Sequence, residues 1–187
     1  MKLTFCISTL LALFLTCTFS LGAESFNKGV VVSVSQPGSD AGLRVLKSGG
    51  NAVDAAIATA FALAVTHPAA GNIGGGGFMV VHPPQGKGEP TVFEYREMAP
   101  KSAFETVYNK NDGMFTHKVS GVPGTVRGLA LAHQRFGSKP WGQLLIPAIE
   151  LAEKGFPISK QLANSLNGLL ATSKEFEELQ RVFKPTN

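Results

Sequence analysis

Arg96 is the side chain of this sequence best suited to hold an anionic substrate. It stands in Glu94-Tyr95-Arg96-Glu97, where it ends a predicted strand soon after a glycine-rich loop. A guanidinium group is always charged, and its planar fork matches the two oxygens of a carboxylate. Arg96 could instead form an ion pair with Glu97 or Glu94 that fixes the strand end. The residue types alone leave both interpretations open.

The four consecutive glycines at positions 74–77 are the most unusual local feature. They do not form a phosphate-binding motif, because no G-x-G-x-x-G opens a helix and no G-x-x-x-x-G-K-[ST] is present. One interpretation is a loop at which two backbones nearly touch, which only glycine permits. Another is a loop whose backbone N–H groups approach a substrate.

Other catalytic chemistry is not indicated. The four histidines, His67, His82, His117 and His133, are far apart and lack the short spacing of zinc ligands. No serine stands in a G-x-S-x-G motif, and the adjacent pair Thr116-His117 is interpreted as part of a loop. We therefore expect no metal, no cofactor and no catalytic residue in this chain.

The N-terminal segment predicts export. Lys2 precedes an uncharged apolar run over residues 3–21, and small residues follow up to Ala23. This order is typical of a secretory signal peptide, here residues 1–23. An uncleaved membrane anchor is the alternative, because the run approaches the roughly 20 residues of a spanning helix. We expect a periplasmic or extracellular protein.

The mature part, residues 24–187, is one domain's length of chain. Both cysteines, Cys6 and Cys17, precede it, so a disulfide scaffold is excluded. Apolar residues make up 44% of the sequence, which suits a globular core. The formal charge of +4 is evenly spread and does not gather with aromatic residues, so we expect no nucleic-acid partner.

Predicted helices and strands must position these residues. Hydrophobic periodicity and turn residues predict a buried strand over 29–35, a helix over 41–47 capped by Ser39 or Asp40, a helix over 52–65 capped by Asn51, strands over 78–82 and 91–96, and helices over 125–136, 141–154, 158–170 and from a capping box at Thr172 to 182. The helix over 52–65 is apolar nearly all round, so we expect it to be buried between layers.

Seven segments, taken in order, resemble the large subunit of γ-glutamyltranspeptidases, most closely the bacterial type. They are residues 49–56 (GGNAVDAA), 64–68 (AVTHP), 74–79 (GGGGFM), 95–100 (YREMAP), 121–126 (GVPGTV), 147–152 (PAIELA) and 155–157 (GFP). The resemblance runs from about residue 29 to the end. Each motif is weak by itself, whereas the ordered set is specific.

This resemblance implies an incomplete N-terminal portion of an α+β, four-layer αββα N-terminal-nucleophile hydrolase. Such enzymes cut themselves to free a threonine, which attacks the γ-glutamyl amide of glutathione or another donor and passes the group to an amino acid, a peptide or water. The residue matching Arg96 binds the donor's α-carboxylate, and Glu97 would support it. The threonine belongs to a small subunit that, with the rest of the large subunit, lies beyond position 187.

The resemblance therefore implies that this chain is a fragment or one piece of a split enzyme, inactive alone. We expect it to associate, since the helix over 52–65 would lack its covering layers. Two alternatives remain. Related acylases cleave cephalosporin-type side chains on the same scaffold, and a non-catalytic remnant of a decayed enzyme would carry the same motifs.

Overall fold

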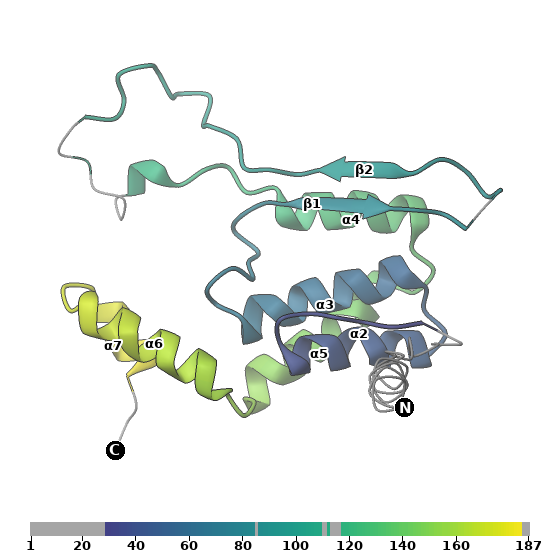
Figure 1. The fold of residues 1–187 in the computed structure, drawn as a ribbon. Helices are drawn as coiled ribbons and strands as arrows, with labels where there is room; N and C mark the ends of the chain where they lie inside the picture. The colour runs from purple at the N-terminus through teal and green to yellow at the C-terminus, as the bar shows by residue number, and fades with distance from the viewer. Residues whose placement is uncertain (1–28, 85, 110–111, 113–116, 185–187) are drawn as a thin grey trace, which may run out of the picture.

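The computed structural model describes residues 29–84, 86–109, 112 and 117–184, and the predicted signal peptide lies outside these ranges. The elements, in order, are α2 (Gln36–Lys47), α3 (Ala52–Thr66), β1 (Phe78–Val81), β2 (Thr91–Glu94), η1 (His117–Val119), α4 (Thr125–Phe136), α5 (Trp141–Lys154), α6 (Lys160–Thr172) and α7 (Glu177–Phe183). Helices α2, α3 and α5 pack together, the β1–β2 hairpin lies over α4, and α6 and α7 form a separate pair (Figure 1). None of the described helices is long and apolar enough to cross a membrane.

Helix α3 is the centre of the core, as its sequence predicts. Asn51 caps it, because its side chain accepts from the N–H groups of Val53 (2.9 Å) and Asp54 (3.0 Å) while the Asp54 carboxylate accepts from Asn51 N (2.9 Å). Ile57 of this helix is fully buried. The expectation that α3 lacks covering layers is wrong, because α2, α4 and α5 already pack around it.

The predicted hairpin is confirmed, with slightly shorter strands. Its antiparallel register pairs Phe78 with Glu94 and Val80 with Val92. The alternate residue Phe93 faces inward, and its ring meets the ring of Phe136 on α4 edge-on at 6.0 Å. The outer face, with Phe78, Val80 and Val92, is exposed. Among the described residues, helices therefore cover the hairpin on one face only.

The predicted strand over 29–35 is not paired in the described part of the chain. Its exposure still alternates, since Val31 packs on the core whereas Val32 is 85% exposed. Helix α2 also begins earlier than predicted, at Gln36, with Ser35 as its cap in place of Ser39 or Asp40. Pro37 is tolerated because the first helical turn has no internal acceptor for its missing N–H.

The two C-terminal helices begin later than predicted. Ser159 caps α6, and its hydroxyl accepts from Leu162 N at 3.1 Å. The expected capping box at Thr172 is wrong, because the Thr172 hydroxyl donates to the carbonyl of Gly168 at 3.1 Å within α6. Helix α7 starts only at Glu177 and has no side-chain cap.

Candidate functional site

Arg96 lies two residues beyond the end of β2, on a backbone that the hairpin still holds. The preceding residue, Tyr95, continues the pairing, with its N–H donating to Gly77 O at 3.0 Å. The Arg96 side chain is 63% exposed, and its bonded partner among the described residues is Glu97, through Nε at 3.3 Å. The terminal nitrogens of the guanidinium fork therefore remain available to a ligand.

Glu97 is ionised beside this guanidinium. Hydrogen bonding from its own backbone N–H lowers the pKa of the Glu97 carboxyl. The charge and the hydrogen bond of Arg96 lower this pKa further, as does the N–H of Gly76, and together these effects outweigh burial, which raises it. The two interpretations of Arg96 are thus compatible, because the bond to Glu97 uses Nε and leaves the outer fork free.

The glycine-rich loop is a close-packing loop in the described structure. A Cβ at Gly76 would lie 2.5 Å from Tyr95 O, 2.7 Å from Glu97 N and 2.8 Å from Arg96 Cα. Any side chain at position 76 would therefore displace the backbone that carries Arg96. On the other side, Gly124 is packed against the carbonyl of Tyr95 in the same manner. The Arg96 backbone is held between these two loops.

Asn72 and Thr125 join the same two loops. The Asn72 side-chain oxygen accepts from Gly75 N at 2.9 Å and from the Thr125 hydroxyl at 2.6 Å. The carbonyl of Gly75 accepts from Gly124 N at 2.8 Å and from Thr125 N at 3.1 Å. We call these four contacts the loop junction.

The ring of Tyr95, the residue before Arg96, packs against α4. Gly128 on α4 meets this ring with no room for a Cβ, and the Tyr95 hydroxyl donates to Phe78 O at 3.3 Å. Burial raises the pKa of Tyr95, so it stays a neutral anchor at physiological pH. Sequence reasoning did not assign roles to Asn72, Tyr95 or Thr125. The available signal was the set of glycines near two of them, at positions 71 and 74–77 for Asn72 and at positions 121, 124 and 128 for Thr125.

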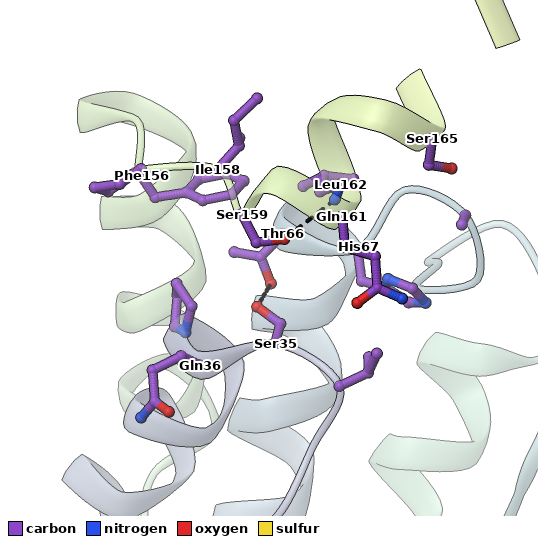
Figure 2. A pocket seen from close by; sticks show the side chains of 14 residues that line it. Ser35, Gln36, Thr66, His67, Phe156, Ile158, Ser159, Gln161, Leu162 and Ser165 are labelled. Carbon is purple, nitrogen blue, oxygen red and sulfur yellow. Dashed lines mark hydrogen bonds between the residues drawn. The ribbon is translucent and has the colours of Figure 1, made fainter. Parts of the chain in front are cut away.

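A separate hollow lies between the start of α2, the end of α3 and the start of α6, and Figure 2 shows the residues that line it. The hydroxyl groups of Ser35, Thr66 and Ser159 in this lining already have partners. The Ser35 hydroxyl donates to Thr66 Oγ1 at 2.8 Å, and Ser159 caps α6. Arg96 is not among the lining residues, so the hollow and the candidate site are distinct.

Two similar solved structures show that this arrangement, with helices packed on a hairpin and Arg96 beside a glycine-rich loop, is part of an α+β N-terminal-nucleophile hydrolase. The crystal structure of Helicobacter pylori γ-glutamyltranspeptidase superposes with a TM-score of 0.77 at 38% identity, over 88% of this chain and 48% of that chain. A γ-glutamyltranspeptidase from Pseudomonas nitroreducens gives 0.73 at 43% identity, over 87% and 51%. The fold class expected from the sequence is thereby confirmed.

Sequence comparison identifies the family. The family model for Gamma-glutamyltranspeptidase matches residues 38–187. A glutathione hydrolase proenzyme of Pseudomonas aeruginosa is 49% identical over 144 residues, which cover 73% of this chain and 25% of that protein. The chain belongs to the γ-glutamyltranspeptidase family. It spans about a quarter of the length of that curated relative.

Proposed function

We propose that this chain supplies the carboxylate-binding part of a γ-glutamyltransferase and glutathione hydrolase. The observation that carries the proposal is the exposed fork of Arg96 on a backbone held from both sides. Arg96 would grip the α-carboxylate of glutathione or another γ-glutamyl donor with two parallel hydrogen bonds. Glu97 would orient the guanidinium through Nε without touching the donor.

A small subunit would supply the reacting groups. In the proposed enzyme, a threonine hydroxyl of a small subunit attacks the γ-glutamyl carbonyl and its own α-amino group takes the proton. The amide C–N bond then breaks, the proton passes to the departing amine, and the γ-glutamyl group stays on the threonine as an ester. Water, an amino acid or a peptide then accepts the γ-glutamyl group. The partners of the chain are therefore the remainder of the large subunit and the small subunit.

The test uses a chimeric proenzyme, in which residues 29–187 replace the matching segment of the Pseudomonas aeruginosa relative. Two anilide donors are compared: γ-glutamyl, and 4-aminobutanoyl, which differs only by lacking the α-carboxylate. Loss of charge-assisted hydrogen bonds costs about 1.5 to 3 kcal/mol, or about ten- to over a hundredfold in binding. Arg96→Ala should lower kcat/KM by that factor for the γ-glutamyl donor and change the 4-aminobutanoyl donor little.

Two further variants complete this experiment. Arg96→Lys keeps the charge but loses the fork, so it should be impaired less than Arg96→Ala. Arg181→Ala is the matched control, because Arg181 is an exposed arginine paired with a nearby glutamate, Glu178. If Arg96→Ala instead blocks self-cleavage and leaves donor affinity unchanged in the matured fraction, Arg96 is a structural residue. Turnover of a cephalosporin-type amide in preference to both anilides would favour the acylase alternative.

We also propose that the protein is exported to the periplasm or the medium, on the basis of the N-terminal pattern. N-terminal sequencing of the purified protein should begin near Glu24. Recovery of intact Met1 from the cytoplasm would contradict this proposal.

A further inference from the structure

We propose that Thr125 and Asn72 are positioning residues for Arg96, because their side chains lock the two loops that hold the Arg96 backbone. The inference rests on the carboxylate-binding role proposed for Arg96. Neither side chain is placed in contact with the donor. Both would act by fixing where the guanidinium fork stands.

The position of Arg96 depends on its backbone more than on its side chain. The guanidinium has one bonded contact among the described residues, a 3.3 Å bond to the neighbouring Glu97, and is otherwise largely exposed. Glu97 is the next residue, so this bond moves with the same segment. A two-bond contact with a carboxylate tolerates little displacement. Whatever holds the main chain at Arg96 therefore sets the affinity for the donor.

The loop on one side of this main chain is held at its end by the backbone pairing of Gly77 with Tyr95, and its earlier residues depend on the junction. Residues 74–77 have no side chains beyond Cα, and a Cβ at Gly74 would meet nothing within 4 Å. The adjoining Ile73 is exposed. A free glycine segment samples many conformations. The Asn72 side chain restricts it by accepting from Gly75 N at 2.9 Å, and the Thr125 hydroxyl restricts Asn72 from the other side at 2.6 Å.

The loop on the other side depends on the same junction. It leads into α4, whose cap residue Gly124 offers no side-chain acceptor. The carbonyl of Gly75 takes that role, since it accepts from Gly124 N at 2.8 Å and Thr125 N at 3.1 Å. Gly124 in turn packs on the Tyr95 carbonyl. One junction therefore links both loops beside the Arg96 main chain, and it adds to the Tyr95–Gly77 pairing and the Met98–Val122 bridge on either side of Arg96.

The experiment compares Thr125→Val with Thr125→Ser in the chimeric proenzyme. Valine keeps the branched shape and removes the hydroxyl, whereas serine keeps the hydroxyl. The readout is the ratio of kcat/KM for the γ-glutamyl anilide to that for the 4-aminobutanoyl anilide. This ratio does not depend on the amount of active enzyme, so a purely structural defect would not change it.

We expect Thr125→Val to lower the ratio about three- to tenfold, the factor for one uncharged hydrogen bond. The loss should appear mainly as a higher KM for the γ-glutamyl donor. Thr125→Ser should restore the ratio to within about twofold, and Asn72→Ala should lower it as Thr125→Val does. The matched control is Thr172→Val, which removes a hydroxyl from an exposed position of α6 and should leave the ratio unchanged.

Several results would overturn this inference. If Arg96→Ala lowers the ratio but Thr125→Val leaves it unchanged, the inference is overturned. The carboxylate-binding role of Arg96 would then stand. If Arg96→Ala itself leaves the ratio unchanged, the proposed function fails first and the inference fails with it. Complete absence of mature Thr125→Val enzyme would also overturn it, because the junction would then be required for folding.

Discussion

Asp54 and Ser138, 84 positions apart in the chain, are joined by three hydrogen bonds to one carboxylate. The Ser138 hydroxyl donates to Asp54 Oδ2 at 2.5 Å, and Ser138 N donates to Oδ1 at 3.0 Å and to Oδ2 at 3.3 Å. Asp54 is 0% exposed. It also accepts from Asn51 N at 2.9 Å. The start of α3 and the connection between α4 and α5 are thus tied together at a buried charge.

Asp54→Asn should destabilise the protein. One of the two carboxylate oxygens that accept from buried N–H and O–H groups would become an NH2 group, which cannot accept a hydrogen bond. We expect a loss of about 1 to 3 kcal/mol, measured as the free energy of unfolding of the chimeric proenzyme in denaturant. Asp40→Asn is the matched control, since the Asp40 carboxylate accepts from Gln36 Nε2 (2.9 Å) at an exposed position of α2. It should change stability by less than about 0.5 kcal/mol. Equal effects of the two substitutions would contradict this account.

The same carboxylate should make stability depend on acid pH. Burial is the largest influence on Asp54 and raises its pKa, but the hydrogen bonds from Ser138, Asn51 and Lys139 together outweigh it, so the pKa is lowered. A lowered pKa in the folded state means that the stabilisation is fully present above the unfolded pKa of about 3.9. It is lost as pH falls from there through the folded pKa. Thermal unfolding between pH 7 and 3 should show a smaller acid loss in Asp54→Asn than in the parent.

Gly128→Ala should destabilise the protein, although alanine favours helices. The new Cβ would collide with Cβ, Cγ and Cδ1 of Tyr95, which lie too near the backbone to move freely. Overpacking of this kind costs about 1 to 3 kcal/mol. The control is Gly168→Ala in α6, where a Cβ would meet nothing within 4 Å. It should stabilise the protein by about 0.5 to 1 kcal/mol, so opposite signs in the melting temperatures are the decisive result.

Residues 29–187 expressed alone should associate and should release no chromophore from a γ-glutamyl anilide. The exposed apolar surface lies on the outer hairpin face, with Val80 and Val92, and along the extended segment around Val32. Such patches promote association. Val80→Thr with Val92→Thr keeps the β-branched shapes and should shift sedimentation toward the monomer. Val182→Thr, at an exposed site on α7, should not. A monodisperse parent that turns over the anilide would contradict both expectations.

The sequence by itself determined the elements whose signals are local. The capped apolar helix α3, the hairpin, α4 and α5 follow from periodicity, caps and breakers within each segment, and all are present close to their predicted bounds. The ordered motifs also identified the family, and the family match, added to the strand-end position, favoured Arg96 as the candidate binding residue. Local signals misplaced the start of α2, because Ser35, Ser39 and Asp40 are all suitable caps. They also misplaced the start of α7, because that helix begins at Glu177 without any side-chain cap.

Only the tertiary structure decided what holds Arg96 in place. Asn72 and Thr125 are 53 positions apart. No local sequence pattern predicts that the Thr125 hydroxyl donates to the Asn72 side-chain oxygen and so joins the two loops. The glycines at 76, 124 and 128 are separate in sequence, yet all three contact Tyr95 or its neighbours. Pairing of the segment around Val32 was likewise not decided locally, since a strand forms only where a second backbone offers its hydrogen-bonding groups. Contacts between distant segments depend on how the whole chain packs, and the sequence of each segment alone does not contain that information.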